Sequence, residues 1–198
     1  MRKGIEKQIA KADAILTQLK PFGAVVAGGA PRDWYRNVVA NDIDVFVAGE
    51  PSKEELLEAL ELKECNLVEL GDGDYSGKHQ RFVGYSFEDE EGQEFQILCH
   101  RKDSVEEIVK NFPNNLSMAI YYGEGKFWYD DWFIVGMDYH VGWFNDESDY
   151  RSDIYENKIL DKFRGPLWTW FSDKGSILRH IGGNEGPAAE LRTWFDDF

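Results

Sequence analysis

The sequence predicts an α+β fold in which strands and helices mix up to about residue 137 and helices prevail afterwards. Apolar residues recur with a helical period over residues 5–19, and short apolar or alternating runs typical of strands follow from residue 24 onward. After residue 137 aromatic and charged residues mix without strand alternation. We therefore expect one domain over residues 1–137 and a helical C-terminal extension over residues 138–198 packed on it.

Turn and capping residues bound the individual elements. Pro21 and Gly23 end the first helix, and Ser52 with Glu55 three positions later forms a capping box for another. Ser104 caps a further helix. The expected elements are helices at 5–19, 52–61, 104–111, 155–163 and 187–198, a short helix that carries Arg32 and Asp33, strands at 24–27, 42–47 and 66–70, and hairpins at 81–100 and 117–135.

The composition restricts the classes of partner. The chain has 198 residues, 42% of them hydrophobic, so it can bury a core. The formal net charge of −15 argues against broad nonspecific binding to nucleic acid, which depends on Lys and Arg. We find no apolar run of the roughly 20 residues that span a bilayer, so no membrane partner is expected.

Cysteine usage and the N-terminal residues bear on location. Cys65 and Cys99 are too few and too irregularly spaced for a disulfide framework or a zinc site. Residues 1–20 lack the compact apolar run of a secretory signal. The expected location is the cytoplasm, or the host cytoplasm if a phage encodes the protein.

The stretch 22–47 carries the strongest functional pattern. An apolar strand leads into Gly28-Gly29 and a short helix, and the next strand carries Asp42 and Asp44. Residues two apart on a strand face the same side, so these carboxylates repel unless a cation compensates them. Mg²⁺ suits such a pair, and a glycine turn before a helix favours a phosphate. The stretch predicts a phosphoryl-transfer site.

Two other acidic pairs are weaker candidates. Asp72 and Asp74 lie in a glycine-rich stretch, which is typical of a solvated turn rather than of fixed metal ligands. Asp130 and Asp131 are neighbours on an expected strand, so they would point to opposite faces. Neither pair is expected to hold a catalytic ion.

The pattern Gly28-Gly29-Ala30-Pro31-Arg32-Asp33 followed by Asp42-Ile43-Asp44 resembles the nucleotidyltransferase superfamily, which has the DNA polymerase β-like fold. It is closest to the head pattern of CCA-adding enzymes and bacterial poly(A) polymerases, and similar to small stand-alone phage nucleotidyltransferases. About 30 residues carry the resemblance. It implies a mixed sheet backed by helices and a catalytic role for residues 1–137.

The resemblance also implies roles for particular residues. Asp42 and Asp44 would hold Mg²⁺, with Mn²⁺ as an alternative, and Gly28 and Gly29 would meet the triphosphate through their backbone. Arg32 would face phosphate or pair with a carboxylate. Asp33 would order the turn, as a helix cap or as the partner of Arg32.

The sequence departs from the superfamily pattern at two places. Many relatives use Gly-Ser, whose hydroxyl touches phosphate, whereas Ala30 offers no hydroxyl here. Polymerising members supply a third carboxylate from a later strand to activate the acceptor. Glu94 is the candidate here, but the strand alternation also allows Gln96, which cannot take a proton.

Residues 155–182 form a locally basic segment in an acidic chain. Lys158, Lys162 and Arg164 are candidate phosphate contacts, interleaved with Trp168 and Trp170. These aromatic side chains can stack on a base or form a core between helices, and both readings stay open. His100 shares the face of Glu94, and a structural role is the simpler reading for it.

The expected function is a Mg²⁺-dependent nucleotidyltransferase that moves a nucleoside monophosphate from an NTP to a hydroxyl-type acceptor and releases pyrophosphate. The acceptor can be a tRNA 3′ end, a small molecule or a protein. The chain is too short for the additional tRNA-binding domains of CCA-adding relatives. The alternative is a nucleotide-binding or partner-binding protein on a degenerate, inactive version of the same fold.

Overall fold

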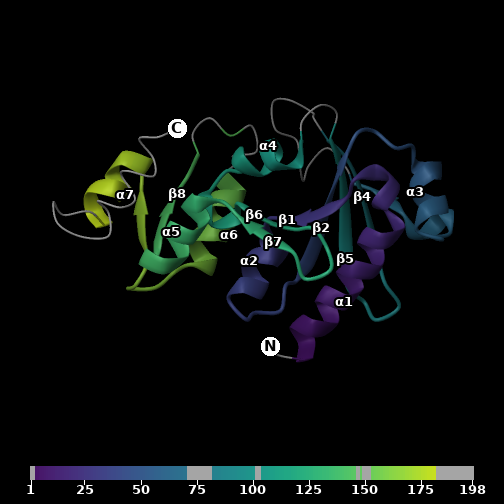
Figure 1. The fold of residues 1–198 in the computed structure, drawn as a ribbon, viewed down its shortest axis with the longest axis horizontal. Coiled ribbons are helices and arrows are strands. Elements are labelled where there is room, and N and C mark those ends of the chain that lie inside the picture. The colour runs from purple at the N-terminus through teal and green to yellow at the C-terminus, as the bar shows by residue number, and fades with distance from the viewer. Residues whose placement is uncertain (1–2, 71–81, 101–103, 146–147, 149–152, 182–198) are drawn as a thin grey trace.

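The computed structural model describes residues 3–70, 82–100, 104–145, 148 and 153–181. Its main sheet has seven strands in the order β3-β4-β5-β2-β1-β6-β7, and β8 pairs with β9 separately (Figure 1). The strands are β1 Val25–Ala27, β2 Asp42–Ala48, β3 Val68–Glu69, β4 Phe82–Glu88, β5 Glu94–His100, β6 Ala119–Tyr121, β7 Phe127–Tyr129, β8 Val141–Trp143 and β9 Thr169–Phe171.

Helices of very different lengths accompany these strands. They are α1 Lys3–Gln18, α2 Gly29–Tyr35, α3 Lys53–Ala59, α4 Val105–Lys110, α5 Asp131–Tyr139, α6 Asp153–Lys162 and α7 Lys174–Ile181, with 3₁₀ turns η1 Lys20–Phe22, η2 Glu64–Asn66 and η3 Asn115–Ser117. In Figure 1, α3 and α7 lie at opposite ends of the molecule, and α1 (purple) lies beside the half of the sheet that contains β4 and β5.

Apolar side chains cover both faces of the main sheet. On one face Ile43, Val45 and Ile97 pack against the buried stripe of α1 and against α3. On the other face Phe46 and Leu98 pack against α4 and α5. The sheet is thus buried on two sides, which fixes the register of β2 and β5 because a one-residue slip would exchange the two faces.

Most of the predicted elements of residues 1–137 are confirmed. Ser52 and Glu55 form the expected capping box at the start of α3, and the hydroxyl of Ser104 accepts a hydrogen bond from the Glu107 amide at the start of α4. β4 and β5 form the first predicted hairpin, and β6 and β7 form the second. The predicted α+β class is therefore confirmed.

The prediction that a strand continues from residue 126 to 135 is wrong. β7 ends at Tyr129, and α5 begins at Asp131. The Asp130 side chain accepts a hydrogen bond from the Trp132 amide at 2.9 Å, so it caps the helix. The argument that Asp130 and Asp131 point to opposite faces of a strand therefore does not apply, because neither residue lies in a strand. The aromatic and β-branched residues of α5 suggest a strand, but tertiary packing overrides that propensity.

The region after residue 137 is less purely helical than expected. β8 and β9 form a parallel pair in addition to α6 and α7. The predicted boundary after residue 137 falls within α5, and the division into two regions stays a prediction. The pattern predicted at 71–78 and the helix predicted at 187–198 lie outside the described residues.

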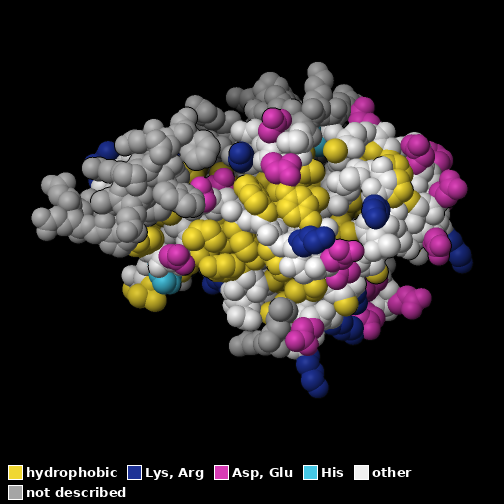
Figure 2. Space-filling view, viewed as in Figure 1, with side chains coloured by type: hydrophobic (Ala, Val, Ile, Leu, Met, Phe, Trp, Pro, Cys, Tyr) yellow, Lys and Arg dark blue, Asp and Glu magenta, His cyan; other side chains and the backbone are white. Residues whose placement is uncertain are grey.

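The surface is mainly acidic at the α3 end of the molecule, where carboxylates gather in the view of Figure 2. Cys99 is buried, and burial raises the pKa of its thiol to about 12, whereas Cys65 is exposed. Within the described residues, no helix combines the length and apolarity that crossing a membrane requires.

Candidate functional site

The candidate site lies where β2 and β5 both begin. The two strands are parallel, with Asp42 opposite Glu94 and Asp44 opposite Gln96. Directly opposite residues of paired strands face the same side of the sheet, so these four polar side chains form one patch. The next pair on that face, Phe46 and Leu98, is buried in the core.

Glu94 and Gln96 both face the patch. The Gln96 Nε2 donates a hydrogen bond to the Glu94 Oε1 at 2.9 Å. Glu94, the predicted third carboxylate, therefore lies on the same face as Asp42 and Asp44. Gln96, the alternative residue for that position, lies beside it. His100 is buried at the other end of β5, opposite Ala48, six residues from Glu94.

Asp44 is in an unfavourable place for a negative charge. Its Oδ1 is buried and has no hydrogen-bond partner among the described residues. Burial, and then the neighbouring Asp42 carboxylate, raise the pKa of Asp44 to about 7, while the charges of Lys158 and Arg32 act in the opposite direction. A buried carboxylate oxygen without a partner calls for a cation.

The donor set at the start of β2 fits Mg²⁺. This ion is usually held by one or two carboxylates and completes its octahedron with water and substrate phosphates. Asp42 and Asp44 supply the two carboxylates, and the unpartnered Asp44 oxygen supplies an open ligand position. In the described part of the chain no three His, Cys, Asp or Glu side chains lie close enough to hold an ion by themselves. The set therefore fits an ion shared with a ligand.

The glycine turn between β1 and α2 lies next to these carboxylates. β1 is antiparallel to β2 with Val26 opposite Val45, and continuing that register brings residues 27 and 28 alongside Asp44 and its neighbour. Gly28 has φ +81° and ψ −117°, and an added Cβ would lie 3.3 Å from the Phe112 ring. Only glycine suits such a backbone without strain.

The backbone of Gly28 is already partly engaged within the protein. Its N–H donates to the Ala119 carbonyl of β6 at 3.0 Å, and the predicted contact of this residue with a triphosphate stays a prediction. Gly29 and Ala30 open α2, where amides lack intrahelical acceptors. The turn therefore offers the amides of residues 29 and 30, while Gly28 shapes the backbone.

Arg32 and Asp33 form a buried pair on α2. The Arg32 Nε donates to the Asp33 Oδ1 at 3.0 Å, and both side chains are about 95% buried or more. Of the two predicted roles of Asp33, helix cap or partner of Arg32, the structure shows the second. Lys162 from α6 forms an ion pair with the other Asp33 oxygen, and the Arg32 Nη1 donates to the Ser117 Oγ at 3.2 Å. Arg32 is thus held by protein partners.

The basic residues of α6 and of the segment directly after it lie in different places. The charge of Lys158 acts on Asp44, so this predicted phosphate contact lies near the patch. Lys162 is bound to Asp33, and burial lowers its pKa. Arg164, two residues after the end of α6, is largely exposed and pairs with Asp161 at 3.5 Å. The structure therefore brings Lys158 and Lys162 to the candidate site and leaves Arg164 on the surface.

The aromatic side chains after α6 pack within the protein. Phe163 and Trp168 meet edge to face with ring centroids 4.6 Å apart, and Phe144 stacks on Trp170 at 4.7 Å. The Arg36 guanidinium lies 4.5 Å from the centroid of the Phe163 ring. These contacts favour the reading in which the aromatic residues form a core.

Three polar residues near the site were missed in the sequence. Tyr155 of α6 contacts the Ser117 hydroxyl at 3.0 Å and accepts a hydrogen bond from the Asn114 amide at 2.9 Å. Burial raises the pKa of the Tyr155 hydroxyl. The Asn-Asn-Leu-Ser run at 114–117 was a usable signal, since adjacent amides and a hydroxyl before a strand are typical of side chains that bond across loops.

Comparison with solved structures decides the fold. The chain is similar to a CCA-adding enzyme with ATP (TM-score 0.62, 14% identity, 88% of this chain and 41% of that chain). It is also similar to a Thermotoga maritima CCA-adding enzyme complexed with tRNA (0.60, 13%, 88% and 42%) and to an apo tRNA-processing enzyme (0.60, 15%, 91% and 47%). The protein has the nucleotidyltransferase-superfamily fold.

This finding confirms the resemblance seen in residues 28–44 at the level of the fold. The chain spans less than half the length of each of these structures. No family model matches the sequence, and no curated protein matches it. The similarity to phage nucleotidyltransferases stays a prediction.

Proposed function

We propose that the protein is a Mg²⁺-dependent nucleotidyltransferase that moves a nucleoside monophosphate from an NTP to a hydroxyl-type acceptor. The observation that carries this proposal is the buried, unpartnered oxygen of Asp44, beside Asp42 and alongside a glycine turn, in a nucleotidyltransferase fold. Burying a carboxylate beside a second one costs stability unless a ligand compensates it.

Asp42 and Asp44 would hold the ion, with Mn²⁺ as an alternative. A bound Mg²⁺ would neutralise charge that develops on the phosphates. The amides of Gly29 and Ala30 face the triphosphate, because the first turn of a helix presents free N–H groups. Lys158 supplies a positive charge on the same side as Asp44. These groups bind and orient the nucleotide.

Glu94 is the residue that takes the proton of the acceptor. The acceptor oxygen forms a bond to the α-phosphorus, the bond from that phosphorus to the bridging oxygen breaks, and pyrophosphate leaves. The hydroxyl proton passes to the Glu94 carboxylate. Gln96, on the same patch, donates a hydrogen bond to this carboxylate and so fixes the orientation of the Glu94 side chain. Asp33 takes no part, since its two oxygens are bound by Arg32 and Lys162.

The nucleotide and the acceptor follow from weaker observations. Similar structures carry ATP, CTP or tRNA, so ATP and CTP are the first nucleotides to test. The formal net charge of −15 disfavours a long polyanion. We therefore favour a small molecule, a protein hydroxyl or a narrowly held RNA 3′ end as the acceptor.

A second candidate function is nucleotide binding without turnover. Gln96 stands directly opposite Asp44, where a carboxylate would complete a three-carboxylate set. In the described residues no such set converges on one point. A protein of this kind would bind an NTP with its ion and act through a partner.

The deciding experiment measures pyrophosphate release with Mg²⁺ or Mn²⁺ and labelled ATP or CTP, with tRNA or small hydroxyl acceptors. Asp44→Asn should lower the rate by about 10³-fold, since metal-assisted charge neutralisation contributes several kcal/mol. Thr17→Ala, on the exposed side of α1, is the control that should keep full activity. Nucleotide-dependent stabilisation of the wild type without pyrophosphate from any acceptor would favour the binding function.

A further inference from the structure

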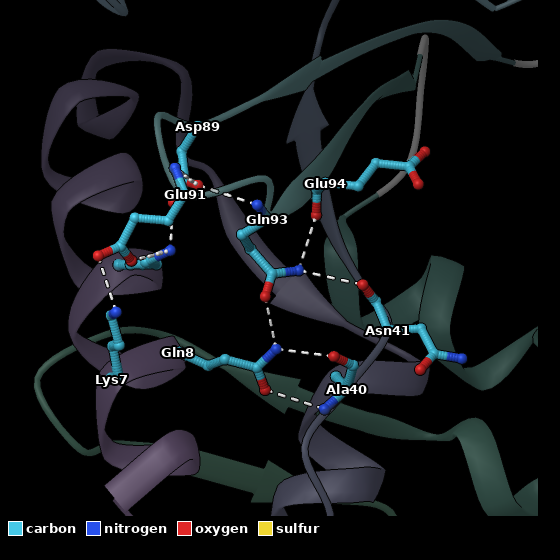
Figure 3. Close-up of polar contacts among 9 residues, drawn as sticks. Lys7, Gln8, Ala40, Asn41, Asp89, Glu91, Gln93 and Glu94 are labelled. Carbon is cyan, nitrogen blue, oxygen red and sulfur yellow. Dashed lines mark hydrogen bonds and ion pairs between the residues drawn. The ribbon is translucent and has the colours of Figure 1, made fainter.

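Gln8 of α1 is a buried polar residue far from the patch in sequence. It is only 4% exposed, and its side-chain amide makes four hydrogen bonds. The Oε1 accepts from the Trp34 indole N–H at 3.0 Å and from the Ala40 amide at 2.9 Å. The Nε2 donates to the Ala40 carbonyl at 2.7 Å and to the Gln93 Oε1 at 2.6 Å (Figure 3). All the hydrogen-bonding capacity of its two N–H groups is used.

The partners of Gln8 belong to the three segments that build the candidate site. Trp34 lies on α2, the helix that follows the glycine turn. Ala40 precedes Asp42, the first residue of β2, by two positions. Gln93 directly precedes Glu94, the first residue of β5. One side chain therefore joins the helix of the turn to the starts of both strands.

Gln93 extends this connection across the end of the sheet. Its Nε2 donates to the Asn41 carbonyl at 3.1 Å and to the Glu94 carbonyl at 3.2 Å, as Figure 3 shows. These bonds lie just beyond the first pair of the parallel ladder, Asp42 opposite Glu94. Gln8 and Gln93 together continue the pairing where the backbone ladder stops.

This end of the ladder needs such a connection. The first pair of a ladder has a neighbouring pair on one side only, so it opens more readily than the interior. Here the first pair also places two carboxylates, Asp42 and Glu94, opposite each other, and like charges in that position are destabilising. The side-chain bonds of Gln8 and Gln93 therefore add connections, a tie between the strands, at the end of the ladder where the paired strands are least supported.

The nearby ion pairs do not replace this tie. Lys7 bonds to Glu91 at 2.7 Å, but both side chains are at least half exposed, and exposed pairs contribute little. Lys11 bonds to Asp89 at 2.6 Å and holds the turn between β4 and β5 rather than the start of β2. Gln8 bonds directly to the segment before Asp42.

We propose that Gln8 is the positioning residue of the candidate site: through Ala40 and Gln93 it holds the starts of β2 and β5 at the spacing that lets Asp42 and Asp44 bind an ion opposite Glu94. The part of this inference that concerns ion binding rests on the proposed function. The part that concerns how Gln8 holds the two strands rests on the hydrogen bonds alone.

The test compares Gln8→Met, which keeps the side-chain length and removes the hydrogen bonds, with Leu16→Ala. Leu16 is buried on the same helix outside the network, so its truncation destabilises the fold without touching the tie. Hydrogen exchange of the whole protein should be about tenfold faster at residues 41–44 and 93–96 in Gln8→Met than in Leu16→Ala. Residues 45–48 and 97–100 should exchange alike in the two variants.

Mn²⁺ affinity, measured by electron paramagnetic resonance at a concentration where all variants are folded, is the second readout. It should fall about tenfold in Gln8→Met and in the milder Gln93→Met, and stay at the wild-type value in Leu16→Ala. Equal exchange and equal Mn²⁺ affinity in Gln8→Met and Leu16→Ala would overturn the proposal. Local loosening in a chain whose wild type binds no Mn²⁺ would support the tie and contradict the proposed function instead.

Discussion

The first pairs of β2 and β5 and the pairs that follow them differ sharply, although they share two strands and one register. On the opposite face every pair from Ile43 and Phe95 onward is apolar and buried. On the candidate face the chain begins with acids and amides and becomes apolar only at Phe46. A sheet that served packing alone would have no reason to bury the Asp44 Oδ1 without a partner among the described residues. The later pairs are explained by packing, and the first pairs are where the proposed ion and nucleotide would bind.

Among substitutions at the strand starts, the largest effect on activity is expected at Glu94. Glu94→Gln keeps the shape of the first pair and removes the proton acceptor, so turnover should fall by about 10²–10⁴-fold. NTP binding, measured by nucleotide-dependent thermal stabilisation, should stay close to the wild-type value. Glu58→Gln is a matched control, because Glu58 is exposed on α3, outside the two strands of the site. Full activity in Glu94→Gln would remove this residue from the mechanism.

Asp44 gives a smaller effect, on stability rather than on rate. Because its pKa is raised to about 7, from about 4 in an unfolded chain, ionisation favours the unfolded state. The contribution of Asp44 to stability is complete below about pH 4 and is lost as the pH rises through about 7. Asp44→Asn cannot ionise, so without divalent ions it should exceed the wild type by about 2–4 kcal/mol at pH 8.

Urea unfolding at pH 4.5 and pH 8, with EDTA present, measures this difference. The two proteins should be nearly equal at the lower pH, and Mn²⁺ at the higher pH should raise the stability of the wild type alone. A gap that is the same at both pH values would show that the Asp44 charge is compensated within the protein.

Lys158 offers the smallest and most selective change. Lys158→Met removes a charge that acts on Asp44, so NTP affinity should fall by about two- to fivefold, in keeping with an exposed cation. Arg164→Met is the control, since Arg164 pairs with Asp161 on the surface. Isothermal titration with a nonhydrolysable NTP measures both variants. Equal losses would mean that the basic residues of this segment act through their general charge rather than through a specific contact of Lys158.

The contrast between the strand starts and their continuations also explains which features of the candidate site could be predicted from the sequence. Asp42 and Asp44 are separated by one residue in an apolar strand, so period-two alternation was enough to place them on one face. Glu94 was found for the same reason, but its pairing with Asp42 depends on a parallel ladder between segments about 50 residues apart. No local pattern encodes that register.

The contacts of Gln8 could not be predicted from local sequence patterns. It lies on the buried side of α1, where a polar residue looks like a break in the helical pattern, and its partners are 26, 32 and 85 positions away. The hydrogen bond of the glycine turn could not be predicted either. Glycines predict a flexible backbone, but they do not reveal that the Gly28 N–H belongs to Ala119 of β6. Long-range bonds of this kind depend on the complete fold.

The parallel pairing of β2 with β5 has a consequence for how the protein reaches its folded state. It is the one parallel pair in the main sheet as described, and the chain between its strands passes through α3, β3 and β4. A contact across so many residues requires the closure of a long loop before it contributes stability, which makes its formation slow. Asp42 and Glu94 therefore come together only after this loop has closed, so the proposed ion site would form late in folding.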